Sequence, residues 1–259
     1  KEFVDSSQPL ELIPNAVVGT SSSRRKNQLL FFREDLKIKD LRGNVPTRIE
    51  KLRKRNYHAI LLAKAGLNRL DIDLSHFIVK DLSPSIFIPA PAQGALGIQV
   101  RENDHDLIKR LSFLINKQTF ENVSFERQIL NNFGGGCHSP FGAYSKLQNN
   151  GRRITWVTYA SEVENTPIRL VTSSNNPIEI VNQIKKKPEV KKIWISRDLD
   201  ENSLFKKLLS SLNFKVEDIS LINKQIVQVE NLPKCNWVFF NSAFSFDSIY
   251  HLKNQISSK

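Results

Sequence analysis

Hydrophobic and polar positions alternate with two different periods along the first part of the chain. Short apolar runs are typical of buried strands, and the stretches between them have the spacing of amphipathic helices. The predicted order is a strand over 16–19, a helix over 22–32, a strand over 36–41, a helix over 45–54 and a strand over 58–63. Strands that alternate with helices in this way form parallel βα units. In such a fold, ligands bind where loops leave the carboxyl ends of the strands.

The rest of the chain predicts smaller units. We expect, in order, a strand over 95–100, helices over 104–115 and 120–133, strands within 141–173, a helix over 177–187, strands over 193–196, 215–219 and 237–240, and helices over 202–212 and 243–252. The charged, proline-broken stretch 185–192 is typical of a linker. The predicted fold class is therefore α/β, with three domains. These are an α/β domain over 1–110, an α+β domain over 111–187 and a partial α/β domain over 188–259.

Composition narrows the class of protein. Two cysteines are too few for a disulfide framework or a cysteine-based zinc site, and no metal is expected. No apolar run is long enough to cross a bilayer and the first residues lack a signal-peptide layout, so we expect no membrane partner and a cytoplasmic location. The chain contains no methionine, and we expect it to be part of a longer protein.

The net charge of +12 is concentrated in one region. Residues 20–69 contain fourteen lysines or arginines against four acidic residues. Such a cluster fits nucleic acid, a phosphate ligand or a polycarboxylate, although basic residues also serve simply as solvated helix faces.

Two loops in this region predict an anion site. The first, 19–25, has a glycine, four hydroxyls and two arginines where a strand passes into a helix, and helix N-termini favour anions. The second, 41–48, contains Arg42, Gly43, Asn44 and Arg48, and arginine can grip a carboxylate with two hydrogen bonds. A helix-capping role for the serines is the simpler alternative for the first loop. The loops contain little aromatic character for base stacking, and Phe31 and Phe32 lie on the apolar face of a predicted helix, so nucleic acid is not the expected partner.

Cys137 follows three glycines, Gly134 to Gly136, and precedes His138. Glycine allows the backbone to approach a bulky ligand closely, so this cysteine is predicted to be presented rather than packed. A buried structural thiol, a metal ligand and an acyl-transfer nucleophile remain alternatives. The other cysteine, Cys235, precedes an apolar run and is expected to pack in a core.

Five motifs in order resemble the successive signatures of the hydroxymethylbilane synthase (porphobilinogen deaminase) family. They are Gly19-Thr20-Ser21-Ser22-Ser23-Arg24-Arg25, Leu41-Arg42-Gly43-Asn44-Val45, Ala63-Lys64-Ala65-Gly66-Leu67-Asn68-Arg69-Leu70, Pro91-Ala92-Gln93-Gly94-Ala95-Leu96-Gly97 and Gly135-Gly136-Cys137-His138-Ser139-Pro140. The resemblance covers roughly residues 10–180. It implies periplasmic-binding-protein-like α/β domains, with residues 1–110 holding the second domain and remnants of the first, and a small α+β domain that carries the cofactor.

The resemblance also implies the chemistry. Members of the family hold a dipyrromethane through a thioether on the cysteine that Cys137 matches, add four porphobilinogen units with loss of ammonia, and release linear hydroxymethylbilane. Each pyrrole carries an acetate and a propionate, which explains a cleft rich in arginine. The implied partners are porphobilinogen and the linear tetrapyrrole, the implied oligomeric state is a monomer, and neither nucleic acid nor membrane is implied.

The implied site residues fall into two groups. The residues expected to bind the cofactor are Cys137, Ser22, Arg24, Arg25, Arg42, Gly43, Asn44 and Gly66. The residues expected to bind substrate are Thr20, Ser21, Arg48, Arg69 and Gln93.

Two departures limit what this chain is expected to do. The family's catalytic aspartate belongs to a Lys-Asp pair upstream of the position of Gly19, and no residue here matches it, so the catalytic residue is unknown and this chain alone is expected to be inactive. From Lys192 on, Ser196-Arg197 and Trp237-Val238-Phe239-Phe240-Asn241-Ser242 are similar to the start of uroporphyrinogen-III synthase, which predicts a fused, bifunctional protein. A non-catalytic anion-binding module of the periplasmic-binding-protein type is the alternative function.

Overall fold

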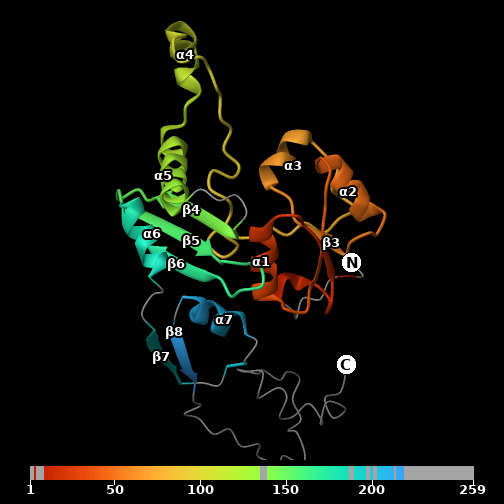
Figure 1. Ribbon diagram of the computed structural model, residues 1–259. Helices are drawn as coiled ribbons and strands as arrows, with labels where there is room; N and C mark the ends of the chain where they lie inside the picture. The colour runs from red at the N-terminus through yellow and green to blue at the C-terminus, as the bar shows by residue number, and fades with distance from the viewer. Residues whose placement is uncertain are drawn as a thin grey trace, which may run out of the picture. The chain divides into compact units, whose positions relative to one another are not determined.

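The structure is a computed structural model of the 259-residue chain (Figure 1). It describes residue 3 and residues 9–134, 139–186, 190–196, 199–200, 203–212 and 214–218. The chain divides into two compact units, one made of Lys1–Trp194 with Leu199–Glu217 and the other of Ile195–Asp198 with Asp218–Lys259. Nearly all the described residues belong to the first unit, which is a mixed α/β structure.

Three parallel strands form the first sheet, in the order β2-β1-β3. These are β1 (Val17–Gly19), β2 (Lys37–Lys39) and β3 (Ala59–Ile60), and they alternate with α1 (Ser23–Phe32), α2 (Val45–Arg53) and α3 (Lys64–Leu70). A short 3-10 helix, η1 (Pro9–Glu11), precedes them. The predicted βα units are confirmed. The central strand β1 is the most buried, because it has a hydrogen-bonded neighbour on each side.

The core beside this sheet explains the apolar periodicity of α1. Ala16, Val18, Leu29 and Phe32 are buried together, and Phe31 is partly buried against them. Both phenylalanines therefore pack in the core rather than offering surfaces for base stacking, as predicted.

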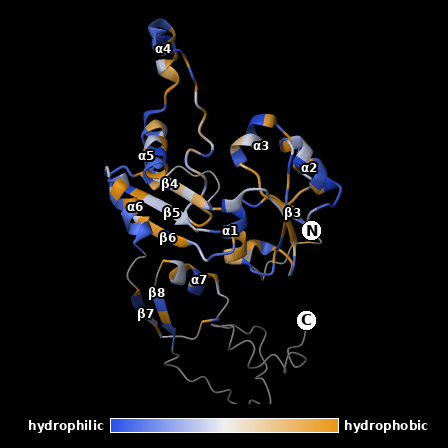
Figure 2. Cartoon of the chain, viewed as in Figure 1, coloured by the Kyte–Doolittle hydropathy of each residue, from blue (hydrophilic) through white to orange (hydrophobic). Residues whose placement is uncertain are grey.

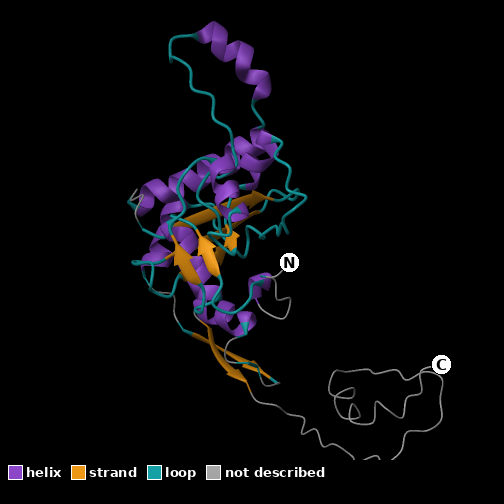
Figure 3. Cartoon of the chain, turned by 90° about the vertical axis from the view of Figure 1, so that its right-hand side faces the viewer, coloured by secondary structure: helices purple, strands orange, loops and turns teal. Residues whose placement is uncertain are grey.

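The prediction of a strand over 95–100 is wrong. The structure has no helix or strand between Asp71 and Asp104, and Figure 3 shows this stretch as loop. Two short helices follow it, α4 (His105–Leu111) and η2 (Ser112–Leu114), where one longer helix was predicted. An apolar alternation forms a strand only beside another strand, and the described residues supply none for this one.

Apolar side chains of this part of the chain are exposed. Leu96 is 84% exposed and Phe113 is 80% exposed, and hydrophobic residues appear beside hydrophilic ones along α4 and the chain next to it (Figure 2). Exposed apolar side chains of this size are candidates for contact with a partner or with another segment of chain.

An antiparallel sheet with two helices forms the second half of the unit. The strands are β4 (Phe141–Leu147), β5 (Arg153–Tyr159) and β6 (Ile168–Thr172), in that order, and the helices are α5 (Lys117–Phe133) and α6 (Pro177–Lys185). Both helices begin at an asparagine cap, Asn116 and Asn176. This confirms the predicted α+β unit.

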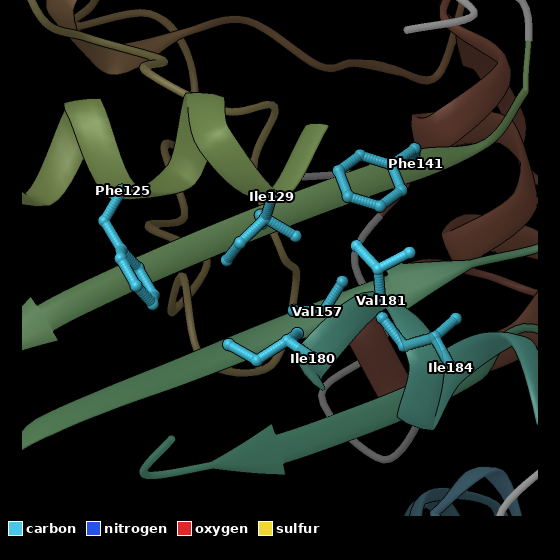
Figure 4. Packing of buried hydrophobic residues seen from close by; sticks show 8 residues of the cluster. Phe125, Ile129, Phe141, Val157, Ile180, Val181 and Ile184 are labelled. Carbon is cyan, nitrogen blue, oxygen red and sulfur yellow. The ribbon is translucent and has the colours of Figure 1, made fainter. Parts of the chain in front are cut away.

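The core of this half lies between the two helices and the sheet. Figure 4 shows side chains from α5, α6, β4 and β5 meeting in one cluster, namely Phe125, Ile129, Phe141, Val157, Ile180, Val181 and Ile184. The cluster fixes α5 on the sheet, and thereby the position at which α5 ends.

The last described elements are β7 (Lys191–Ile195), α7 (Leu204–Ser211) and β8 (Phe214–Asp218), with β7 paired to β8. They match the strand, helix and strand predicted there. The strand and helix predicted over 237–240 and 243–252 lie outside the described residues, as does Cys235. Among the residues that the structure describes, no helix is both long enough and apolar enough to cross a membrane.

Candidate anion-binding site

The carboxyl ends of the three parallel strands bring the predicted loops together. Since β1, β2 and β3 run in the same direction, the residues that follow them lie at one edge of the sheet. The first turns of α1, α2 and α3 begin at this edge. Unpaired backbone N–H groups at helix starts favour anions, so this edge is the place for the predicted site.

A serine hydroxyl joins the first two loops. Ser21 Oγ accepts a hydrogen bond from the backbone N–H of Leu41 at 3.0 Å and donates one to the Leu41 carbonyl at 3.1 Å. Thr20 is buried, and its Oγ1 accepts from the N–H of Ser22 at 3.3 Å. Ser22 caps α1, since its side chain accepts from the N–H of Arg25 at 3.5 Å. These three hydroxyls therefore shape the loop, and the capping role weighed from the sequence is present at Ser22.

The second loop is shaped by Gly43 and Asn44. Gly43 has a φ of +114°, a conformation that other residues rarely adopt, and a Cβ there would lie 2.8 Å from Cγ2 of Thr47. Asn44 caps α2 by accepting from the N–H of Thr47 at 2.9 Å. Arg48 donates from Nε to the Gly43 carbonyl at 2.7 Å, while Arg42 is exposed.

Arg24 is buried and serves the packing of the loop. Its side chain is on the buried face of α1, with 7% of the residue exposed. Nη1 donates to the carbonyl of Ile88 at 2.6 Å, and Nη2 donates to Oε1 of Gln93 at 3.0 Å. The structure thus brings the predicted Gln93 to the predicted Arg24, although 69 positions separate them.

Arg25 is half-buried and points along the edge of the sheet. Its Nη1 donates to the carbonyl of Leu61, which follows β3, at 2.9 Å. Burial, and then the positive charge of Arg48, lower the pKa of Arg25. Burial, and then the charge of Arg25, lower the pKa of Arg24 to about 10. The guanidiniums of Arg24, Arg25 and Arg48 therefore lie close enough for the charge of one to disfavour the charged form of its neighbour.

No acid balances this cluster within the described part of the chain. None of Arg24, Arg25, Arg42, Arg48 and Arg69 forms an ion pair there. Clustered cations without a counter-charge are stabilised when an anion binds, and two arginines suit a carboxylate or a phosphate.

The two remaining predicted residues that the structure describes, Gly66 and Arg69, lie in α3. Gly66 lies in the first turn of α3, and a Cβ there would be 3.6 Å from Val45 Cγ2, so this glycine faces the start of α2. Arg69 is exposed in the last turn of α3, away from the edge where that helix begins.

Cys137 lies outside the described residues. What the structure shows is the helix before it, α5, which ends at Phe133 with Gly134 in the left-handed conformation (φ +117°). This ending is a common way to stop a helix, and the sequence indicated it through the glycines. The cysteine thus follows α5 closely in the chain.

Sequence reasoning missed a group of buried polar residues beside the site. Gln28 is fully buried, with Nε2 donating to the Ile88 carbonyl at 2.9 Å and Oε1 accepting from the Ile88 N–H at 2.7 Å. Arg169 of β6 donates from Nη2 to the Ile86 carbonyl at 2.5 Å. Glu126 of α5 is buried as well. A polar residue one turn after Arg24 on an apolar helix face was the signal available for Gln28; Arg169 and Glu126 gave none.

A hollow and a search for metal ligands complete the description of possible sites. The hollow, of about 550 Å³, runs along α2 from Pro46 in its first turn to Arg53 in its last, and Ile72 also lines it. Within the described ranges, no group of three or more histidine, cysteine, aspartate or glutamate side chains could hold a metal ion.

Comparison with known families matches two successive stretches of the chain. Residues 3–109 match the profile "Porphobilinogen deaminase, dipyromethane cofactor binding domain", and residues 120–187 match "Porphobilinogen deaminase, C-terminal domain". The first stretch contains the sheet edge and its arginines, and the second contains α5, the antiparallel sheet and Cys137. These matches favour the enzyme family over a non-catalytic anion-binding module.

Curated relatives agree with the profiles. A porphobilinogen deaminase of Natranaerobius thermophilus is 40% identical over 172 residues, which is 65% of this chain and 55% of the relative. That of Maridesulfovibrio salexigens is 42% identical over 161 residues, 62% of this chain and 51% of the relative. That of Bacillus thuringiensis is 43% identical over 140 residues, 54% and 45% respectively. The chain spans about half the length of these relatives. Residues 3–109 and 120–187 together make up more than half of the chain, and over these two stretches the chain belongs to the porphobilinogen deaminase family.

Proposed function

We propose that the protein to which this chain belongs is a hydroxymethylbilane synthase. The reaction joins four porphobilinogen molecules on a covalent dipyrromethane primer with loss of four ammonia molecules, and one water then releases hydroxymethylbilane. The observation that carries the proposal is the cluster of Arg24, Arg25 and Arg48 at the sheet edge, which has no acidic partner among the described residues. The match of residues 3–109 to the dipyromethane cofactor binding domain supports it.

The residues present fit such a cofactor. A dipyrromethane bears acetate and propionate groups, which need cationic donors and open backbone N–H groups. The edge offers half-buried Arg25 and exposed Arg42, and the exposed Gly43 and Asn44 present the backbone that leads into α2. The lowered pKa values of Arg24 and Arg25 mark charges that a carboxylate would stabilise. When bound, the cofactor supplies the pyrrole carbon to which the first substrate is joined.

The residues take different roles in this proposal. Arg25, Arg42 and Arg48 contact carboxylates of the cofactor and of the bound substrate, and Ser22, Asn44 and Gly66 shape the backbone around them. Thr20 and Ser21 hold the first loop in place, and Arg69 contacts the outer part of a longer pyrrole chain. Arg24 and Gln93 support the others, since each is engaged with the other. Cys137 carries the thioether.

Intact mass of the freshly purified full-length protein tests the proposal. The wild-type protein is expected to carry an adduct of two pyrrole units and to consume porphobilinogen. Cys137→Ser should lose both the adduct and the activity, and Cys235→Ser, the matched control, should keep both. An unmodified wild-type protein that does not consume porphobilinogen would refute the proposal, and an adduct that persists in Cys137→Ser would refute the role of that cysteine.

The proposal extends to the rest of the protein. We place residues 1–110 in a periplasmic-binding-protein-like part and residues 111–187 in the domain that carries the cofactor. The exposed Leu96 and Phe113 support packing of 94–120 against further chain of the same protein. The catalytic carboxylate would come from that further chain, so the activity is proposed for the whole protein and not for these 259 residues alone.

Residues 188–259 are proposed to begin a uroporphyrinogen-III synthase-like domain. The strand, helix and strand of β7, α7 and β8 after the second matched domain support this, as do the motifs after Lys192. The protein would then be a bifunctional cytoplasmic monomer that makes and cyclises the linear tetrapyrrole. Conversion of porphobilinogen to uroporphyrinogen III by the purified full-length protein alone tests this part.

A further inference from the structure

The buried carboxylate of Glu126 joins two segments of backbone that are far apart in the sequence. Its Oε2 accepts from the N–H of Ala92 at 2.8 Å, and its Oε1 accepts from the N–H of Ser145 in β4 at 2.8 Å. Only 5% of Glu126 is exposed. A buried carboxylate that accepts backbone hydrogen bonds with both oxygens is a specific feature, because an unpaired one would be costly.

The carboxylate lies where these two segments part. The outer edge of β4 pairs with the segment before Ala92, since the N–H of Ala143 donates to the Pro89 carbonyl at 3.1 Å. At Ala92 and Ser145 the two segments are not hydrogen-bonded to each other. The N–H groups of both residues donate to the carboxylate of Glu126 instead. The side chain of α5 thus takes the place of the missing backbone acceptors.

The turn that Glu126 holds has an unusual backbone. Ala92 has a φ of +63°, the left-handed conformation that is unfavourable for a residue with a Cβ. Such a conformation persists only where the surroundings impose it, and the hydrogen bond from Ala92 N–H to Glu126 is part of those surroundings. The residue after it is Gln93, whose Oε1 accepts from Arg24 Nη2 at 3.0 Å.

We propose that Glu126 is a positioning residue of the anion-binding site, acting through the turn at Ala92 and Gln93 on the guanidinium of Arg24. This inference rests on the proposed function. Glu126 does not itself contact Arg24 in the structure; it fixes the backbone from which Gln93 reaches the arginine. Arg24 in turn lies beside Arg25 in the first turn of α1, so a displaced Arg24 displaces the charges that meet the ligand.

The position of Glu126 on α5 gives this contact a second consequence. The same helix ends at Phe133, and Cys137 follows four positions later in the chain. A single helix therefore leads to the residue that carries the cofactor and also holds the turn that supports the arginine. The hydrogen bond also joins the two matched stretches of chain, because Ala92 belongs to the first and Glu126 to the second.

A double-mutant cycle on the full-length protein tests the inference. Glu126→Gln keeps one acceptor oxygen and places an amide NH₂ against the other backbone N–H. Gln93→Ala removes the side-chain oxygen that accepts the hydrogen bond from Arg24. Three quantities are measured for each variant: the fraction of protein that carries the Cys137 adduct by intact mass, KM and kcat for porphobilinogen per loaded enzyme, and Tm. Glu162→Gln, an exposed glutamate after β5, is the matched control.

If Glu126 acts through Gln93, each single variant raises KM or lowers the loaded fraction by about fivefold or more, and the double variant is no worse than the more severe single one. Effects that multiply in the double variant would show that the two residues act independently, and would overturn the inference. So would a Glu126→Gln variant that lowers Tm but leaves loading and KM unchanged.

Two arms keep the outcome interpretable. Should Glu126→Gln fail to fold, Gln93→Ala with wild-type loading and KM would overturn the inference by itself, because no effect could then pass through Gln93. The wild-type arm tests the proposed function separately. If the wild-type protein carries the adduct and is active, but the effects of the two single variants multiply in the double variant, only the role of Glu126 is refuted. If the wild-type protein has neither adduct nor turnover, the proposed function is refuted.

Discussion

Gly142 provides a test of how closely the two halves of the unit pack. It lies in β4, and a Cβ added there would be 2.8 Å from the carbonyl oxygen of Pro89, 3.0 Å from that of Ile88 and 3.0 Å from Cδ of Arg24. Two of these three atoms belong to backbone, which cannot turn aside as a side chain can. Ordinary contact begins at about 3.5 Å, so Gly142→Ala requires a backbone shift of roughly 0.5 Å or more.

The cost follows from that shift. Overpacking of a buried site costs about 1–3 kcal/mol. Moving Pro89 also weakens the adjacent hydrogen bond from Ala143 N–H, which is worth about 1 kcal/mol. We expect the free energy of unfolding to fall by about 2–4 kcal/mol, and Tm by about 4 °C or more.

Thermal unfolding of the full-length protein measures this effect, with Lys146→Ala on the exposed side of the same strand as the control. The control should change Tm by about 1 °C or less. A Gly142→Ala protein that melts within the same range would mean that β4 does not lie against residues 88–89 as described. It would also remove the steric argument for a fixed Arg24.

Three further changes have defined outcomes. Arg25→Gln should lower kcat/KM for porphobilinogen about tenfold or more, because it removes a charge-assisted contact. The control Arg127→Gln changes an exposed arginine of α5 and should not lower it; equal effects would contradict the role of Arg25 in binding. The pKa of Asp35 is lowered to about 2, chiefly by its hydrogen bonds from Arg33, so its contribution is present above about pH 4 and is lost as pH falls toward 2. Asp35→Asn should therefore destabilise the protein by up to about 1 kcal/mol at neutral pH, a value kept small because the carboxylate is partly exposed and screened, and by much less at pH 2. Denaturant unfolding at the two pH values measures this, and a difference that does not change with pH would contradict it. Thr158→Val should raise the free energy of unfolding by about 1 kcal/mol, because the buried Thr158 Oγ1 has no hydrogen-bond partner among the described residues, and a loss of stability in the same assay would show that it has one.

Local patterns were enough to predict the elements around the sheet edge. The strand at Val17–Gly19 and the helix from Ser23 follow from apolar spacing and a serine cap, both of which are properties of neighbouring residues. The turn at Gly43 was predictable for the same reason, since its glycine is required by its own backbone angle. The convergence of these loops then followed from the parallel βα rule.

Long-range contacts were beyond those patterns. Glu126 lies in an amphipathic helix, and nothing in its sequence surroundings shows that its partners are backbone groups at Ala92 and Ser145. The burial of Arg24 was missed for the same reason, because its acceptors at Ile88 and Gln93 lie in a segment without periodicity. The strand predicted over 95–100 was wrong because an alternating pattern specifies a strand's faces but not its neighbour.

The order in which Arg24 acquires its partners has a consequence for synthesis. All pairings of the parallel sheet lie within residues 17–60, so the sheet can form as soon as that short stretch has emerged from the ribosome. The guanidinium then remains hydrated until residues 88 and 93 arrive, and Gly142 approaches it later still. Domains fold from the N-terminal side as they are made. We therefore expect a nascent chain that ends before residue 88 to expose this arginine to water, and the completed chain to enclose it.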